Sequence, residues 1–456
     1  MHGGEKIFSS RLPCFGKSKS RLTWRKYRAR EIISKSQQQA IALAITFLAS
    51  VILTGACGKS ITTSWEETGL KIGALIPLTG DLSSLGQPMP EVIGLAVNTV
   101  NQCGGVNGKP VTLVVEDSQT NPEVGVAAMT QLVEVEQVAG VVGGFASGVS
   151  TAALPIAVRS QVMLISPAST SPIFTQKAQQ GEFEGYWART APPDTHQARA
   201  LAKLAREKGF KLVSIVTIDN DYGIGLEQQF IEAFEQLGGT VVNKYQPSRY
   251  DPQATTFDNQ VLLYSFGNTP EALVAILYPQ TGALWLKAAN QQNLLEQTTL
   301  ILTDGVYSPD FPEQVGKTNK GKSLLAGAIG TVPQVNGQGL ANFTKVWQEQ
   351  TGQEVSVFAP HAYDATVLLM LAAEAAGVNT GEGIKSKIPE VAGGTGKKVT
   401  DVCEAMELVR QGNKINYQGA SGNVDLDENG DVAGNYDTWA VEADGKLKVT
   451  GKIIPD

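Results

Sequence analysis

The chain has 456 residues, of which 42% are hydrophobic and 18% charged. This length exceeds that of one ordinary core and favours two lobes of globular composition. Residues 1–56 carry ten Lys/Arg and two Glu, so residues 57–456 carry the remaining 27 basic and 42 acidic residues, a net charge of −15. An acidic body of this kind excludes nucleic acid and an anionic membrane surface as its main partners.

Residues 1–56 have the pattern of an export leader. A basic stretch, Arg21–Lys35, precedes a mostly apolar run, Ala40–Ala56, that is somewhat shorter than the roughly 20 apolar residues of a spanning helix. The run ends in LTGAC, which resembles a bacterial lipobox with Cys57 as the lipidated residue, although Thr54 stands where leucine is usual. Cleavage after Ala56 by an ordinary signal peptidase, or an uncleaved anchor, is the alternative. We expect a protein of the periplasm or cell surface, anchored to the membrane through Cys57, with residues 57–69 as a linker.

The cysteine and histidine content bears on disulfides and metals. Beyond Cys14 in the leader and Cys57, only Cys103 and Cys403 remain. Two cysteines in an oxidising compartment can form one bridge, and two free buried thiols are the alternative. The sequence has no CxxC pair and no histidine cluster, so we expect no metal site.

From Leu70 onward, short apolar runs alternate with helical periodicity, which is typical of βαβ units and parallel sheets. The first set predicts strands at Ile72–Ile76, Val111–Glu116, Val138–Gly143 and Met163–Ser166, with helices at Pro90–Val100, Pro122–Val135 and Ser150–Arg159. The second set predicts strands at Leu212–Ile218, Val241–Tyr245, Leu273–Tyr278 and Leu300–Thr303, with helices at Thr195–Lys208, Gly225–Leu237 and Thr281–Gln291. Two such sets predict an α/β fold of two doubly wound parallel-sheet lobes.

The last third of the chain is less regular. An apolar run at Ala326–Val332 precedes helical patterns at Leu340–Thr351 and Tyr363–Gly377. A Gly/Lys/Thr-rich loop follows from Gly393 to Thr400. Val424–Ile453 predicts short antiparallel strands joined by DENGD and ADGK turns.

Ligands of doubly wound sheets bind beyond the carboxyl ends of the strands, so the segments after the strands are the candidate site. Gly143 and Gly144 follow the third strand and allow a close backbone approach, and Ser147 lies near a helix start whose N–H groups suit a carboxylate. A helix cap formed by Ser147 or Ser150 is the alternative. The other segments are Pro77–Met89, Leu164–Phe174, Asp219–Gly225, Tyr278–Gly282 and Thr303–Phe311.

Three other chemistries find little support. GGFASG is not a GxSxG elbow, and neither His196 nor His361 has a serine or cysteine partner visible in the sequence, which disfavours a serine hydrolase using Ser147 or Ser166. DLDENGD copies half of an EF-hand loop, but Tyr436 stands where the bidentate Glu should be. No GxGxxG or Walker pattern occurs, so no nucleotide or other cofactor is expected.

In their order along the chain, the motifs from about Leu70 to the end resemble the periplasmic leucine/isoleucine/valine-binding (LivK-like) proteins, the type I solute-binding components of ABC importers. The resemblance rests on KIGALIPLTG (Lys71–Gly80), VNQCGGVNGKPVTLVVEDSQTNP (Val100–Pro122), VVGGFASGVST (Val141–Thr151), ISPASTSP (Ile165–Pro172), DNDYGIG (Asp219–Gly225), AYDA (Ala362–Ala365) and YQGASGNVDLDENGD (Tyr417–Asp431).

The resemblance implies two lobes joined by a three-segment hinge: residues 70–188 plus 331–435, and residues 189–330 plus 436–456. It implies a monomer without enzymatic activity that closes on a free amino acid, of the neutral or branched-chain type, and delivers it to ABC permease subunits. The disulfide that some family members have near the second and third strands has no counterpart here. A Cys103–Cys403 bridge would instead join a first-lobe helix to a late helix at Asp401–Gln411.

The resemblance also implies a set of ligand-binding residues. Ser147, with Ala168 and Thr170, holds the α-carboxylate and amine, and Tyr222 closes from the second lobe. Asp304 pairs with the ammonium, although the family often has Glu and a cap or turn role is the alternative. The remaining pocket positions are Leu85, Phe145, Ala146, Tyr278 and Phe358.

Elementary energetics agree with a zwitterionic ligand. Charge-assisted hydrogen bonds contribute roughly 1.5–3 kcal/mol each, so a few of them with an apolar pocket reach the roughly −8 kcal/mol of a micromolar complex. An amide or urea-type ligand, or the same fold acting as an amino-acid sensor with a receptor as partner, are the alternatives. An exported serine hydrolase is the third class, and it predicts turnover.

Overall fold

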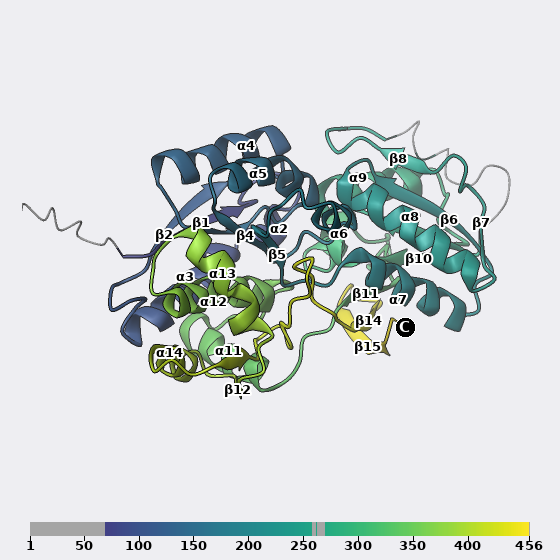
Figure 1. Ribbon diagram of the computed structural model, residues 1–456. Helices are drawn as coiled ribbons and strands as arrows, with labels where there is room; N and C mark the ends of the chain where they lie inside the picture. Colours follow the sequence, from purple (N-terminus) through teal and green to yellow (C-terminus); the bar gives the residue numbers. More distant parts are fainter. Residues whose placement is uncertain (1–68, 258–260, 262–269, 456) are drawn as a thin grey trace, which may run out of the picture. The chain divides into compact units, whose positions relative to one another are not determined.

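The computed structural model describes residues 69–257, 261 and 270–455 (Figure 1). The expected leader and the lipidation site Cys57 lie outside these residues. Within the described part, no helix combines the length and the apolar character needed to span a membrane.

The first sheet is wholly parallel, in the order β2-β1-β3-β4-β5. Its strands β3 and β4 are buried throughout and β1 is buried except at its first residue, as a sheet covered on both faces requires. The strands are β1 (Lys71–Ile76), β2 (Thr112–Asp117), β3 (Gly140–Gly143), β4 (Met163–Ser166) and β5 (Trp187–Arg189).

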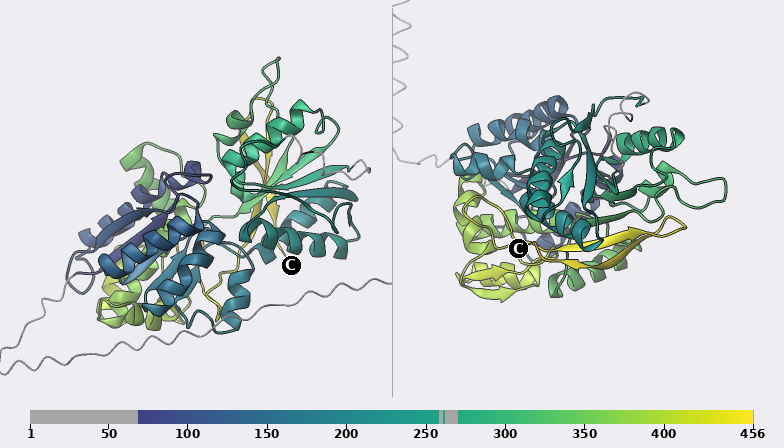
Figure 2. Two further views of the ribbon diagram at one scale, coloured as in Figure 1. Left: turned by 90° about the horizontal axis from the view of Figure 1, so that it is seen from above. Right: turned by 90° about the vertical axis from the view of Figure 1, so that its right-hand side faces the viewer.

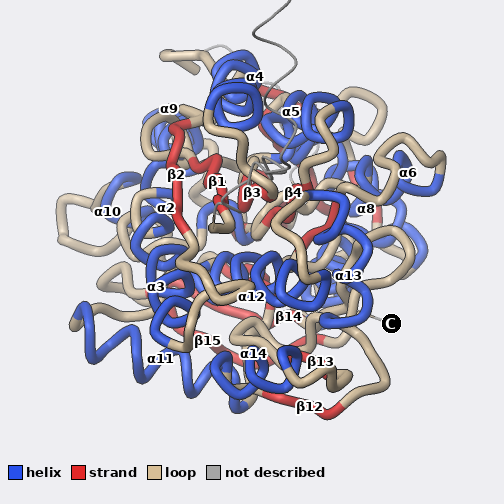
Figure 3. The backbone as a smooth tube through the Cα atoms, turned by 60° about the vertical axis from the view of Figure 1, so that its left-hand side comes forward, coloured by secondary structure: helices blue, strands red, loops and turns tan. Residues whose placement is uncertain are grey.

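Helices cover both faces of the first sheet, as Figure 3 shows. One face carries α4 (Pro122–Thr130), which continues as a π-helical turn to Val135, and α5 (Ser147–Arg159). The other face carries α3 (Met89–Gln102) and α12 (Ala359–Ala376), with α13 (Gly381–Ala392) beside them. The two-sided cover confirms a doubly wound first lobe.

The second sheet has the order β15-β14-β11-β10-β9-β6-β7, with β8 also pairing with β6. Its parallel part repeats the first sheet's order, because the chain enters at β6, adds β7 on one side and then β9, β10 and β11 on the other. The strands are β6 (Leu212–Ile218), β7 (Thr240–Val241), β8 (Ser248–Tyr250), β9 (Ala272–Ile276), β10 (Thr299–Leu302), β11 (Ile329–Pro333), β14 (Tyr436–Val441) and β15 (Leu447–Ile453).

The helices of the second sheet come mostly from the segments between its parallel strands. Helix α7 packs on α8 and on the strands β11, β14 and β15. The antiparallel hairpin of β14 and β15 is the long yellow element of Figure 2. The helices are α7 (Asp194–Glu207), α8 (Asp221–Gln236), α9 (Pro279–Gln291) and α10 (Phe311–Val315).

The chain crosses between the two sheets three times: after β5, after β11 and before β14. Helix α11 (Gln338–Thr351) follows the second crossing. Strand β11 spans the expected lobe boundary at 330/331 and belongs to the second sheet, so the crossing falls after Pro333. The α/β class with two doubly wound lobes and a three-segment hinge is confirmed.

The predicted strand Val241–Tyr245 is wrong beyond its first residue. The backbone turns there, with Lys244 N donating to the Val241 carbonyl. The Asn243 side chain replaces a paired strand, because its amide accepts from Ile215 N at 3.0 Å and donates to the Ile215 carbonyl at 2.8 Å. A tertiary hydrogen bond thus overrides local β-propensity, and the strand that pairs here is β8.

The loop expected at Gly393–Thr400 contains a strand, β12 (Lys397–Val399), paired in parallel with β13 (Ile415–Tyr417). The Gly/Lys composition of this segment gives no local signal for a strand. The strand forms by pairing with β13, which follows the intervening helix α14 (Val402–Arg410). The turn expected at DENGD is present, closed by an antiparallel bridge between Leu426 and Val432.

A disulfide joins Cys103, at the end of α3, to Cys403 in α14, with Cα atoms 5.4 Å apart. Arg410 reinforces this junction by donating to the carbonyls of Cys103 at 2.6 Å and Gly105 at 2.5 Å. The bridge closes a loop across a sequence separation of 300 residues.

Replacing both cysteines by serine should lower the free energy of unfolding by about 2–4 kcal/mol, because the unfolded chain loses a long-range constraint. Denaturant unfolding measures the change. As a control, a reducing agent should destabilise the natural protein and leave the double variant unaffected. Equal stability of the two proteins would contradict a stabilising role for the bridge.

Candidate functional site

Both parallel sheets have a switch point at which successive strands are added on opposite sides of the first strand. In the first sheet it lies between β1 and β3, and in the second between β6 and β9. Ligands of doubly wound sheets bind at the carboxyl ends of the strands beside such a point. The segments that leave these strand ends carry the candidate residues.

A narrow cavity of about 20 Å³ lies among these segments. Eight of the ten predicted ligand positions line it, and Leu82 and Gly305 complete the lining. The eight are Leu85, Phe145, Ala168, Thr170, Tyr222, Tyr278, Asp304 and Phe358. This volume holds about one water molecule, so a ligand the size of an amino acid enters only when the lining side chains or the two lobes move.

The turn after β3 is built by two glycines with positive φ, +147° at Gly143 and +71° at Gly144. A Cβ atom would lie 2.2 Å from the Leu75 carbonyl oxygen at the first and 1.7 Å from Ser150 Oγ at the second, so both positions require glycine. The turn ends at Ala146, the N-cap of α5, which has no side chain to cap the helix. The first N–H groups of α5 therefore receive no side-chain acceptor from their cap residue, which directly follows Phe145 of the cavity lining.

Ser147 and Ala146 do not line the cavity. The Ser147 side chain is buried, and its Oγ accepts a hydrogen bond from Ser171 N at 3.3 Å. In this arrangement Ser147 braces the loop after β4 to the loop after β3. Its role in holding a ligand stays a prediction.

Two aromatic residues of the cavity wall have strained backbones. Phe145 has a φ of 54° and Phe358 a φ of 63°, and their rings meet edge to face with centroids 5.7 Å apart. Positive φ is unusual for bulky residues. It persists where the surrounding structure fixes the backbone, and such positions cluster at functional sites. The two rings form a fixed apolar wall, with Leu82 and Leu85 also in the lining.

On the second lobe, Tyr222 and Asp304 form one hydrogen-bonded unit. The Tyr222 hydroxyl lies 2.8 Å from Thr303 Oγ1 and donates to Asp304 Oδ1 at 3.0 Å. The Tyr222 ring stacks on Tyr278, with centroids 5.5 Å apart. Asn220 starts the helix that carries Tyr222 by accepting from Gly223 N at 2.9 Å.

Burial dominates the electrostatics of the site. It raises the pKa of Asp304 to about 6, although the hydrogen bond from Tyr222 partly opposes this shift. Burial, followed by the charge of Asp304, raises the pKa of Asp194 well above its usual value. Two neighbouring carboxyl groups therefore share a dry site.

Asp194, the first residue of α7, was not predicted from the sequence. It is fully buried, and neither carboxylate oxygen has a well-formed hydrogen bond within the described part of the chain. The nearby Thr170 Oγ1, which lowers the Asp194 pKa slightly, is likewise buried without a well-formed partner there. In the sequence, Asp194 follows two prolines at a helix start and has the pattern of an ordinary cap.

A second missed residue, Asp81, links the two lobes. Its carboxylate accepts from Gln280 N at 2.7 Å and Thr281 N at 3.0 Å, and from the Thr281 hydroxyl. Gln280 also donates to Ser83 Oγ at 2.9 Å. Tyr278, the N-cap of α9, offers no side-chain cap, so a first-lobe carboxylate caps this second-lobe helix.

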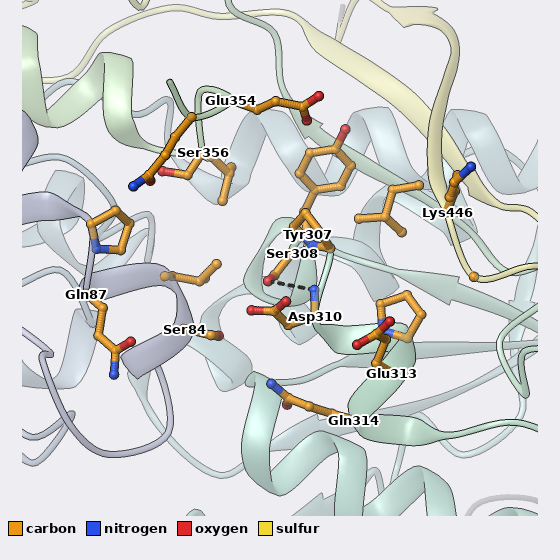
Figure 4. A pocket seen from close by; sticks show the side chains of 18 of the residues that line it. Ser84, Gln87, Tyr307, Ser308, Asp310, Glu313, Gln314, Glu354, Ser356 and Lys446 are labelled. Carbon is orange, nitrogen blue, oxygen red and sulfur yellow. Dashed lines mark hydrogen bonds between the residues drawn. The ribbon is translucent and has the colours of Figure 1, made fainter. Parts of the chain in front are cut away.

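A larger cavity of about 1150 Å³ lies beside the narrow one, and Leu85 lines both (Figure 4). Its lining mixes polar and apolar residues, and its charged residues are five carboxylates and two lysines. The carboxylates are Glu91, Asp310, Glu313, Glu354 and Asp444, and the lysines are Lys317 and Lys446. No group of His, Cys, Asp and Glu able to hold a metal ion occurs in the described residues.

The fold and the site define a type I periplasmic binding protein, which binds a small solute and is not an enzyme. The receptor family ligand binding region matches residues 89–444, and the chain belongs to this family. Within it, the similarity to Leu/Ile/Val-binding proteins confirms a LivK-like member.

Two relatives illustrate the similarity. The chemotactic signal transduction system substrate-binding protein BasB of Halobacterium salinarum is 28% identical over 78% of this chain and 83% of its own length. Leu/Ile/Val-binding protein homolog 2 of Brucella abortus is 28% identical over 70% of this chain and 81% of its own length.

Solved structures of binding proteins are similar to this chain in fold. The leucine binding protein LivK from Thermotoga maritima is 26% identical, with a TM-score of 0.70 over 85% of this chain and 99% of that protein. A solute-binding protein from R. palustris in complex with 4-hydroxybenzoate shares the fold, with a TM-score of 0.66 and 21% identity over 85% of this chain and 97% of that protein.

Replacing Asp81 by Ala should lower the free energy of unfolding by about 0.5–2 kcal/mol, because α9 loses its cap. Denaturant unfolding measures the loss. Asp310→Ala is a matched control, since Asp310 stands at the N-cap of α10 without a side-chain cap hydrogen bond. Equal effects of the two substitutions would rule out the cap.

Proposed function

We propose that this protein captures a neutral amino acid and presents it to an ABC permease. The observation that carries the proposal is the buried carboxyl pair of Asp194 and Asp304. None of the described lining residues is Lys, Arg or His. Arg189, whose charge reaches Asp194, is ion-paired with Asp431 at 2.6 Å. A ligand ammonium group would supply the cation that these two carboxyl groups lack and would favour their ionised form.

Two groups of donors would suit the carboxylate of a ligand, although Thr170 also lies beside Asp194. Thr170 offers a buried hydroxyl without a well-formed partner, and the nearby N-terminus of α5 lacks a side-chain cap. Hydroxyl and N–H donors at a helix start stabilise an anion. A zwitterion would place its carboxylate against these donors and its ammonium against the carboxyl pair, with the Tyr222 hydroxyl closing from the second lobe.

The apolar wall favours an uncharged side chain. Leu82, Leu85, Phe145 and Phe358 offer aliphatic and aromatic surface without a polar side-chain atom. An acidic side chain would meet no cation there. We therefore favour neutral, branched or otherwise apolar amino acids as ligands.

A simple aromatic acid, the kind of ligand bound by the R. palustris protein, is less compatible with this site. Its carboxylate would approach Asp304 without an ammonium group to offset the repulsion. An amide or urea-type ligand would also leave both acids unneutralised, and it is the second outcome of the test below.

We further propose that the protein acts as a monomer in the periplasm or at the cell surface, held by lipid on Cys57. The similarity to Leu/Ile/Val-binding proteins supports a permease as partner. The similarity to BasB supports a chemotactic receptor as the alternative partner. The same ligand site would serve either partner.

A thermal-shift and calorimetric screen of the twenty common amino acids should reveal binding at millimolar concentration or below. For the best ligand, the corresponding amine and the corresponding deaminated acid should each bind much more weakly. Binding of acetamide or urea, with no response to any amino acid, would overturn the proposal.

Asp304→Asn should weaken the affinity for that amino acid by about tenfold or more, because it removes charge and preserves shape. Asp310→Asn removes an acid from the larger cavity instead and should leave the affinity unchanged. A loss of equal size in both variants would point to a general charge effect rather than to the ammonium site.

The affinity should fall as the pH drops through about 6, because protonation of Asp304 removes a charge that the ammonium needs. The stability of the free protein should change in the opposite direction. The folded-state pKa of about 6 lies above the reference value of 3.8, so Asp304 adds to the free energy of unfolding as the pH falls between these values. Calorimetry and denaturant unfolding from pH 7 to 5 measure the two trends. Asp304→Asn should weaken both trends and leave the part of the stability trend that comes from Asp364, whose pKa burial also raises to about 6. An affinity independent of pH would contradict the assignment.

A further inference from the structure

Arg189, the last residue of β5, is completely buried and makes four side-chain hydrogen bonds. Its Nε donates to Asp431 Oδ1 at 2.6 Å, and its Nη2 donates to Thr175 Oγ1 at 2.8 Å. Its Nη1 donates to two backbone carbonyls, those of Ser169 at 3.1 Å and Ser171 at 2.9 Å. These two residues flank Thr170, which lines the narrow cavity.

The loop after β4 is held by its carbonyl groups. Arg189 takes the carbonyls of Ser169 and Ser171, and Asp194 N donates to the carbonyl of Thr170 at 2.8 Å. A trans peptide unit is planar, with its C=O and N–H on opposite sides. Because Arg189 holds the Ser169 carbonyl, the N–H of Thr170 in the same peptide unit points away from Arg189. Because Asp194 N holds the Thr170 carbonyl, the N–H of Ser171 points away from Asp194 and donates to Ser147 Oγ.

Residues next to the hinge crossings hold the guanidinium group of Arg189 in place. Asp431 also accepts from Thr175 Oγ1 at 2.6 Å, so the carboxylate engages both Arg189 and the partner of its Nη2. The backbone of Arg189 donates to the Gly430 carbonyl at 2.9 Å. Arg189 stands just before the first crossing between the sheets, and Gly430 and Asp431 stand before the third.

We propose that Arg189 is a positioning residue for ligand binding, which orients Thr170 by holding the two flanking carbonyls. A planar fork with several donors is suited to this task, because it bonds Asp431, Thr175 and two carbonyls at fixed angles. A lysine at this position would retain the charge but not the fork. The inference rests on the proposed function for its ligand, but the geometry of the loop can be tested without one.

Arg189→Lys should weaken the affinity for the amino acid found in the screen by about tenfold or more. In a Thr170→Ala background the same substitution should weaken the affinity by clearly less, because the hydroxyl that it positions is gone and only the backbone N–H of residue 170 remains. Additive losses would show that Arg189 acts independently of Thr170 and would overturn the proposal.

Arg249→Lys is the matched control for loss of a guanidinium fork. Arg249 donates to Glu227 at 2.6 and 3.2 Å in the second lobe, with no contact to the loop after β4. It should leave the affinity unchanged. A loss like that of Arg189→Lys would assign the effect to general destabilisation.

Hydrogen exchange of the loop in the free protein separates this inference from the proposed function. Amides of residues 168–171 should exchange faster in Arg189→Lys than in the natural protein and no faster in Arg249→Lys. Unchanged exchange overturns the inference whatever the ligand. Absence of amino-acid binding by the natural protein, with faster exchange in the variant, overturns the proposed function and upholds the positioning.

If Arg189→Lys does not fold, the double variant Arg189→Gln, Asp431→Asn removes both buried charges together, which avoids leaving one of them unpaired. It should show the same faster exchange and the same coupling to Thr170. If the amides of residues 168–171 exchange in this variant at the rate of the natural protein, the inference is likewise overturned.

Discussion

A carboxylate in a protein interior is unfavourable unless a cation or several donors accompany it. Asp194 and Asp304 are both buried, the charge of Asp304 raises the pKa of Asp194 further, and the oxygens of Asp194 have no well-formed partner in the described structure. The neighbouring cation, Arg189, is paired with Asp431. In the function that we propose, a cationic group on the ligand would favour the ionised form of this pair, and this difference between free and bound states would shift the protein towards its ligand-bound form.

The fold concentrates the polar and apolar parts of the site by repeating one strand order twice. The switch point of the first sheet contributes the uncapped start of α5 and the strained ring of Phe145, and that of the second contributes Tyr222 and Tyr278. Arg189 and Asp431 lie just before the first and third hinge crossings, and Arg189 holds the loop that carries Thr170. A change in the hinge therefore has a short physical route to the ligand loop, through the buried ion pair.

Much of this could be predicted from the sequence, because the relevant signals are local. Alternating apolar runs predict the strands Met163–Ser166 and Leu212–Ile218 with the bounds that the structure has. Segments after strands, together with the family resemblance, locate the residues that line the narrow cavity. Gly143 and Gly144 predict a turn whose backbone conformation only glycine can adopt.

The missed features depend on partners distant in the chain. Asp194 looks like a helix cap until its burial is known. Arg189 ends β5, a strand that was not predicted, and its role becomes visible only when Asp431 is placed beside it. Asp81 caps a helix 200 residues away. Asn243 ends a strand early by bonding Ile215 through its side chain. No pattern within a short window encodes such pairings.

The disulfide between Cys103 and Cys403 has a consequence for the order in which the protein is made. The second sheet has all its parallel strands once residue 333 is synthesised, whereas the first sheet waits for α12 to cover its second face and for α14 to bring Cys403 to α3. The first sheet, whose five strands are made first, therefore depends on helices made after residue 358. This delay keeps the early part of the chain from completing a stable lobe, which would suit the export that we propose.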